Sequence, residues 1–118
     1  MIVVYVAGPY VGESAWAIEE NVRRAEALAL GVWRLGAVPI CPHTSSRFFY
    51  GAIEEKTALD GDLELVSRCD ALILVDDWRR SRGARSERAF AEELAIPIFE
   101  TLDALHAWLN EKAIEAKA

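Results

Sequence analysis

The feature that most constrains the fold is the run Ala71-Leu72-Ile73-Leu74-Val75, which is apolar at every position and bracketed by acidic residues. A strand with apolar side chains on both faces is typical of a parallel sheet that helices cover on each side. A second apolar run, Ile2 to Ala7, is rich in β-branched residues and stops at Gly8-Pro9. The two runs predict buried strands of one sheet.

Helical patterns alternate with these runs. Apolar residues at helical spacing predict a long helix that ends at Gly36, and its stripe consists of Ile18, Val22, Ala25, Ala29 and Val32. Strands are expected over 37–41 and 96–99, loops over 43–52 and 77–83, and helices over 84–95 and from residue 102 onward. A weaker helical stretch before Asp70 is expected to break at Asp60-Gly61-Asp62. The alternation predicts one domain over residues 1–118, a three-layer α/β sandwich with a small, mostly parallel, flavodoxin- or Rossmann-like sheet.

Length and composition narrow the class of protein. The 118 residues, 53 % of them hydrophobic, suffice for one packed core. Cys41 and Cys69 stand far apart without a CxxC pair, which argues against a disulfide framework and a zinc site. No apolar stretch approaches the ~20 residues that span a bilayer, and the N-terminus lacks a signal-peptide pattern. We therefore expect a cytoplasmic protein that needs no metal or organic cofactor.

The charge is distributed unevenly along the chain. A net charge of −6 disfavours binding to a nucleic acid polymer or an acidic membrane. Residues 79–88 nevertheless carry a local charge of +4, because five arginines stand there against Glu87 alone. This segment predicts a site for a small anion.

The parallel-sheet topology selects candidate site residues. Ligands of such folds bind beyond the carboxyl ends of the strands, where neighbouring connections leave to opposite faces. The first strand ends at Gly8-Pro9, the second leads to His43, and the third leads into the segment that ends at Gly83. Asp62 is expected at a helix start that returns to this rim, and Glu87 about one turn into the next helix. These placements bring four side chains that carry chemistry toward one rim: Tyr5, Asp62, Ser81 and Glu87.

Each of these residues also has a purely structural interpretation. Acidic residues near helix starts complement the helix dipole, and Asp62 would ordinarily be an N-cap. Ser81-Arg82-Gly83 could be only a turn, and a strand tyrosine such as Tyr5 is most often part of the core. His43 and His106 lack a metal-ligand pattern. Only the convergence of the four side chains favours a functional site.

Two blocks of this sequence resemble a known family. The opening Val4-Tyr5-Val6-Ala7-Gly8-Pro9-Tyr10 is similar to the start of nucleoside 2-deoxyribosyltransferases and of their deoxynucleotide N-hydrolase relatives. So is Asp62 followed by Asp70-Ala-Leu-Ile-Leu-Val and by Asp77-Trp78-x-x-Ser81-x-Gly83-Ala84-x-x-Glu87. The similarity extends over roughly residues 2 to 99, and its nearest match is a small bacterial and phage branch of that superfamily.

The resemblance implies roles for individual residues. Glu87 matches the glutamate that attacks the anomeric carbon, and Asp62 matches the acid that orients the sugar or assists departure of the base. Tyr5 matches a tyrosine that supports the nucleophile, and a helix start would keep Glu87 ionised. Ser81, Gly83 and Arg85 match the region that holds a 5′-phosphate, where amides at a helix start favour an anion. With the rim residues, the expected substrate-binding set is Gly8, Pro9, His43, Ser81, Gly83 and Arg85.

The resulting prediction is an enzyme that cleaves the N-glycosidic bond of a (deoxy)nucleotide or nucleoside, passing the sugar to water or to a second base. Two alternatives stay open: a nucleotide-binding module without turnover, and an interaction domain whose contact patch includes Trp78. The apolar loop Phe48-Phe49-Tyr50 predicts a homodimer or higher homo-oligomer in which each loop covers the partner's site. The alternative for this loop is that it folds back onto its own second strand.

Overall fold

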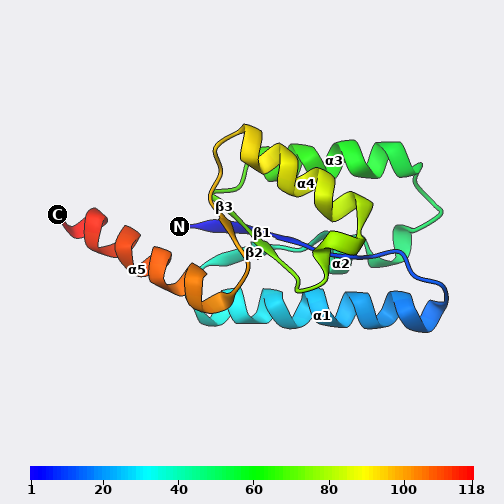
Figure 1. The fold of residues 1–118 in the computed structure, drawn as a ribbon, viewed down its shortest axis with the longest axis horizontal. Helices are drawn as coiled ribbons and strands as arrows, with labels where there is room; N and C mark the ends of the chain where they lie inside the picture. Colours follow the sequence, from blue (N-terminus) through cyan, green and yellow to red (C-terminus); the bar gives the residue numbers. More distant parts are fainter.

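A four-stranded parallel sheet lies at the centre of the chain, and the computed structural model describes all residues, 1–118 (Figure 1). The strand order is β2-β1-β3-β4, and every neighbouring pair is parallel. The strands are β1 (Val3–Ala7), β2 (Val38–Ile40), β3 (Ala71–Leu74) and β4 (Ile98–Phe99). The order and direction confirm the predicted α/β class with a flavodoxin-like sheet.

Helices cover both faces of the sheet, as the apolar third strand predicts. Figure 1 shows α1 (Ala15–Arg34) and α5 (Leu102–Lys117) on one face, and α3 (Glu55–Ser67) and α4 (Arg82–Glu93) on the other. The connections also hold the short helix α2 (Pro42–Ser45) and two 3-10 turns, η1 (Arg47–Phe49) and η2 (Trp78–Arg80). The C-terminal part of α5 extends past the end of the sheet (Figure 1). No helix combines the length and the apolar character needed to cross a membrane.

Local signals in the sequence set the helix boundaries. Ser14, Ser81 and Thr101 are the N-caps of α1, α4 and α5, and each side-chain oxygen accepts an N–H bond at 3.1 Å from the residue three positions later. At the end of α1, Gly36 adopts a φ of 87°, a left-handed conformation that glycine takes without strain. The predicted end of this helix is confirmed.

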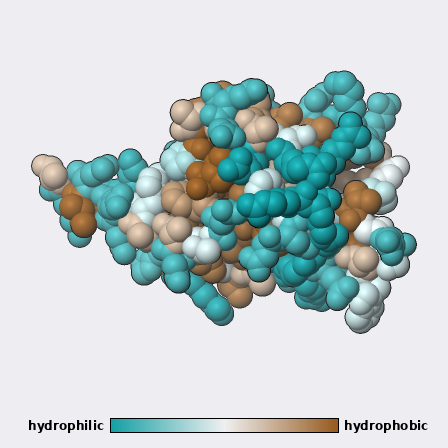
Figure 2. Space-filling view, viewed as in Figure 1, coloured by the Kyte–Doolittle hydropathy of each residue, from teal (hydrophilic) through white to brown (hydrophobic).

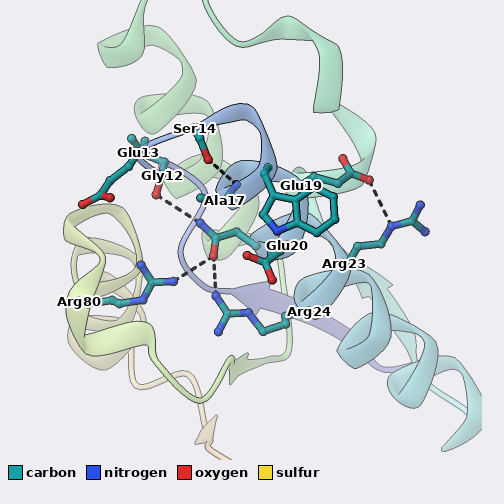
Figure 3. Close-up of a pocket in the computed structure, with 12 residues that line it drawn as sticks. Gly12, Glu13, Ser14, Ala17, Glu19, Glu20, Arg23, Arg24 and Arg80 are labelled. Atoms are coloured by element: carbon teal, nitrogen blue, oxygen red, sulfur yellow. Dashed lines mark hydrogen bonds and ion pairs between the residues drawn. The ribbon is translucent and has the colours of Figure 1, made fainter.

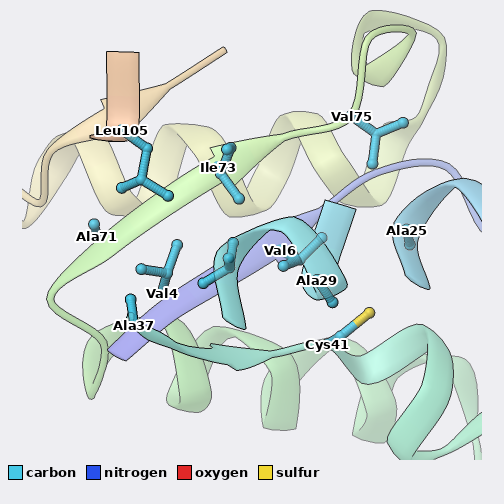
Figure 4. Packing of buried hydrophobic residues seen from close by; sticks show 11 residues of the cluster. Val4, Val6, Ala25, Ala29, Ala37, Cys41, Ala71, Ile73, Val75 and Leu105 are labelled. Carbon is cyan, nitrogen blue, oxygen red and sulfur yellow. The ribbon is translucent and has the colours of Figure 1, made fainter. Parts of the chain in front are cut away.

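Two clusters of buried side chains hold the layers together. On one face Val4, Val6 and Ile73 pack against α1 and α5 (Figure 4). On the other face Tyr5 and Leu72 pack against α3 and α4. Because successive strand residues point to opposite faces, β1 sends Tyr5 toward α4. The space-filling view shows a mostly hydrophilic surface interrupted by smaller hydrophobic patches (Figure 2).

The two edges of the sheet are short. On the β2 side, the N–H of Val38 donates to the carbonyl of Ile2 at 2.9 Å, so the next residue, Pro39, has its nitrogen toward the open edge. On the other side, β4 contains two residues. The strand predicted over 96–99 is shorter because Ile96 is still bonded to the carbonyl of Ala91, which closes the end of α4.

Several other predicted boundaries were wrong. The loop expected over 43–52 contains α2 and η1, and the loop over 77–83 contains η2. Helix α4 begins at Arg82 rather than residue 84, because Ser81 caps it. The break expected at Asp60-Gly61-Asp62 is absent, since α3 runs without interruption from Glu55 to Ser67.

Candidate active site

The carboxyl ends of β1 and β3 lie side by side at the edge of the sheet where the topology predicts a site. After β1 the chain continues into α1 on one face, and after β3 it continues into α4 on the other. Gly8 lies directly beyond β1, where a Cβ atom would stand 2.5 Å from Cγ2 of Val75. The two strand ends can therefore approach this closely only with glycine at that position.

A buried tyrosine–glutamate pair lies on the α4 face of the sheet. The hydroxyl of Tyr5 donates a hydrogen bond to Oε2 of Glu87, and the two residues are 0 % and 7 % exposed. Glu87 shares the inner face of α4 with Ala84 and Ala91, which lie one turn before and after it. The small alanines let α4 approach β1, so the long Glu87 side chain reaches the Tyr5 hydroxyl.

Asp62 belongs to the same group, although by a different route than predicted. It lies inside the uninterrupted helix α3, half-buried, and not at a helix start. Helix α3 packs beside α4, and the charge of Asp62 raises the pKa of both Glu87 and Tyr5. The structure thus brings together the three residues predicted to be catalytic.

Burial controls the protonation of this group. Removal from water raises the pKa of Glu87 to about 8, the charge of Asp62 adds to this rise, and the hydrogen bond from Tyr5 opposes it. Burial also raises the pKa of Asp62 to about 6 and lifts that of Tyr5 far above its usual range, so Tyr5 stays a donor. The expectation that a helix start keeps Glu87 ionised was wrong, because Glu87 lies in the second turn of α4 and is buried, which raises its pKa.

Ser81, Gly83 and Arg85 lie at the start of the same helix. The Oγ of Ser81 accepts the Ala84 N–H at 3.1 Å, and Nη1 of Arg85 donates to the carbonyl of Arg79 at 2.6 Å. Gly83 is open on its side-chain face, with the nearest atom 3.9 Å from a Cβ placed there. No hydrogen bond joins these three residues to Tyr5 or Glu87.

Most of the neighbouring arginines have acidic partners in the chain. Arg80 pairs with Asp77 at 2.6 Å, and the other two pairs are Arg79 with Glu100 at 3.5 Å and Arg88 with Glu92 at 3.1 Å. Arg79 and Arg88 both contact the ring of Trp78, with guanidinium carbons 4.6 and 5.1 Å from its centre. The local charge predicted from this segment is therefore mostly compensated, and only Arg82 and Arg85 are without an ion pair.

His43 holds the loop that follows β1. Its Nε2 lies 2.9 Å from the carbonyl oxygen of Pro9, and its ring contacts Tyr10 edge to face at 5.5 Å. Burial lowers the pKa of His43, so the neutral ring donates from Nε2 and leaves the buried Nδ1 without a partner. His43 and Pro9, both predicted at the rim, are thus in direct contact with one another.

Asn21 ties the loop after β1 to the 3-10 turn after β3, and it was not among the predicted site residues. Its side-chain amide, 3 % exposed, donates to the carbonyls of Tyr10 and Val11 at 3.0 and 3.3 Å. Its Oδ1 accepts from Arg24 and Arg80 (Figure 3). Both arginines also pair with Asp77. The signal in the sequence that could have identified Asn21 is its place next to Val22, in the apolar stripe of the helix. The network borders an open concavity of about 1220 Å³ at the start of α1, the helix on the opposite face of the sheet from α4.

The aromatic loop is open to solvent. Phe48, Phe49 and Tyr50 are 83 %, 52 % and 64 % exposed, and only Tyr50 contacts another ring, that of Tyr10 at 5.6 Å. The loop does not fold back onto β2. No group of three or more His, Cys, Asp or Glu side chains is placed to hold a metal ion.

Comparisons with known proteins support the fold. The model of the family described as "Domain of unknown function (DUF7768)" matches residues 2–101. No curated protein matches the sequence. A solved structure of a 2-deoxyribosyltransferase from the psychrotolerant bacterium Bacillus psychrosaccharolyticus is similar, with a TM-score of 0.60 and 17 % identity over 81 % of this chain and 69 % of that one. At this identity the likeness establishes a shared fold.

Proposed function

Since the chain belongs to the DUF7768 family, whose description names no activity, we propose an activity from its own site: cleavage of the N-glycosidic bond of a nucleoside or nucleotide. The observation that carries this proposal is the buried Tyr5–Glu87 pair with Asp62 beside it. The fold shared with a 2-deoxyribosyltransferase supports it, as do the two sequence blocks that resemble that family and its N-hydrolase relatives.

The proposed reaction has two displacements. In the first, the ionised carboxylate of Glu87 attacks C1′ while the C1′–N bond breaks, and the bonding pair leaves with the base, which takes a proton from Asp62. In the second, water or another base attacks C1′ of the glycosyl ester, gives its proton to Asp62, and releases Glu87. The Tyr5 hydroxyl holds Oε2 of Glu87, which orients the carboxylate.

This sequence of steps needs one proton on the pair of carboxyls. Their pKa values of about 8 and about 6 leave one proton shared between Glu87 and Asp62 near neutral pH. For attack, this proton must lie on Asp62, so that Glu87 is ionised. The hydrogen bond from Tyr5 favours that arrangement, because it stabilises the ionised form of Glu87.

The direct test is release of free base. We expect incubation with a panel of nucleosides and nucleoside monophosphates between pH 6 and 8 to release base from at least one of them, measured by chromatography. Adding a second free base distinguishes transfer from hydrolysis, since only transfer yields a new nucleoside. Binding of a panel member without any base release would favour the alternative, a nucleotide-binding module, and neither binding nor release would contradict both.

We also propose that the substrate carries a 5′-phosphate, held at the start of α4 by Ser81, the amide of Gly83 and the side chains of Arg82 and Arg85. The support for this is that these two arginines alone in the segment have no acidic partner. Gly8, Pro9 and His43 would line the adjoining part of the substrate site.

A monophosphate is therefore expected to bind roughly tenfold or more tightly than the matching nucleoside, because the bond to the arginine is charge-assisted. The preference should shrink as salt is raised. Calorimetry should show that Arg85→Gln loses this preference for the monophosphate. The control is Arg23→Gln, which replaces an exposed arginine on α1 and should keep the preference. Equal affinity for nucleoside and monophosphate at low salt would contradict the phosphate site.

The whole chain is proposed to act as one such domain and to work as a homo-oligomer, a homodimer or larger. The exposed aromatic loop at residues 48–50 supports a contact with a second copy near the site.

A further inference from the structure

The outer face of α1 carries apolar side chains that nothing in the chain covers. Figure 1 shows α1 along the margin of the molecule, with no element on its outer side. The inner stripe of the helix is buried, yet Leu30 and Trp33 are 47 % and 57 % exposed, and Ala27 is exposed beside them. Residues three and four positions apart share one face of a helix, so these side chains form one patch.

Residues equally distant from Leu30 on its two sides are complementary in size and charge. Three positions to either side of Leu30 stand Ala27 and Trp33, a small and a large side chain. Four positions to either side stand Glu26 and Arg34, an acid and a base. When a helix packs antiparallel against a copy of itself across a two-fold axis, residues equally distant from the axis face each other. An axis at Leu30 would therefore place each Trp33 on the partner's Ala27 and each Arg34 on the partner's Glu26.

The charges at this patch are available for such a contact. Arg34 is exposed in the last turn of α1 and has no ion pair in the chain. Glu26 is 48 % exposed at its side chain and has only a long contact with Arg23, at 3.4 Å. The patch thus joins an apolar centre to complementary charges at its rim, the usual anatomy of a protein interface.

We propose that α1 binds α1 of a second copy of this chain, antiparallel, with the two-fold axis at Leu30. Because α1 runs against the strand direction, its C-terminal half lies at the amino edge of the sheet, away from the carboxyl-edge site. The contact leaves that site open and is independent of the proposed reaction.

The first test is the mass of the purified protein at several concentrations, by light scattering and analytical ultracentrifugation. We expect the wild type to form at least a dimer, and Leu30→Glu to raise the dissociation constant on the order of 100-fold, because two carboxylates would be buried against each other. Trp16→Glu is the matched control: Trp16 is 76 % exposed near the other end of the same helix, and its replacement should not change the mass. A wild type that stays monomeric, or a Leu30→Glu variant that associates like the wild type, would overturn the proposal.

A charge exchange tests the register without touching the apolar centre. Glu26→Arg and Arg34→Glu should each weaken the dimer, since each places like charges opposite one another. The double variant Glu26→Arg/Arg34→Glu restores opposite charges and should recover most of the lost affinity. Circular dichroism checks the fold of all four proteins. A double variant no tighter than the weaker single variant would show that these two side chains do not face each other across a two-fold axis.

Discussion

Replacing Glu87 by Gln is expected to lower the rate of base release by about 1000-fold or more. The amide has nearly the same shape, and its oxygen can still accept the Tyr5 hydroxyl, so the buried arrangement should survive. The amide cannot form the glycosyl ester, because it is a far weaker nucleophile than a carboxylate. Initial rates of base release at saturating substrate measure this effect as a fall in kcat.

The same helix supplies the matched control for that measurement. Glu92 lies on α4 with a 66 % exposed side chain and pairs with Arg88, so Glu92→Gln should keep the wild-type rate. Circular dichroism should give equal helix content for the two variants and the wild type. A Glu87→Gln variant with a rate within tenfold of the wild type would remove Glu87 from the role of nucleophile.

The second large effect concerns stability: Glu87→Gln is expected to stabilise the protein at alkaline pH. The raised pKa of about 8, against an ordinary value of 4.5, means that the folded protein keeps the proton longer than the unfolded chain. Below pH 4.5 the ionisation of Glu87 therefore does not change the free energy of unfolding. This free energy falls as the pH rises toward 8, and above pH 8 it is lowered by the full cost of a buried charge. Gln removes a penalty of roughly 2 to 5 kcal/mol, given about 1.4 kcal/mol for each unit of pKa.

Urea unfolding of the wild type and Glu87→Gln from pH 5 to 9 measures this difference. The advantage of the variant should be small at pH 5 and grow toward pH 8, where it should level off. Asp62 also has a raised pKa, but it is present in both proteins and largely cancels. Two stability curves that stay parallel over the whole pH range would show that Glu87 is not buried as a neutral acid.

The strand pattern of the sequence carried enough information to predict the core of the fold. The apolar runs of β1 and β3, together with glycine at Gly8 and Gly36, are local signals, and the structure uses each of them as expected. Asp62 was misplaced because Gly61 was interpreted as a helix breaker. A single glycine weakens a helix by about 1 kcal/mol, which the packing of α3 on the sheet outweighs.

The electrostatics of the site could not be predicted from local signals. The acidic partner of Arg79, Glu100, is distant in sequence, and the partner of Arg80, Asp77, also binds Arg24 of another helix. The pKa of Glu87 depends on its burial and on Tyr5 and Asp62, which belong to two other elements. Ion pairs and pKa values follow from three-dimensional packing. The position of Glu87 on its helix could therefore be predicted from the sequence, whereas its protonation state could not.

The short edges of the sheet bear on how this protein behaves when it is concentrated. An exposed strand edge can add a strand from another molecule and so begin aggregation. Here Pro39 lacks the N–H that would point outward from β2, and β4 offers only two residues for pairing. Both edges therefore disfavour growth of the sheet from one molecule to the next, which leaves helices and loops as the more favourable surfaces for self-association.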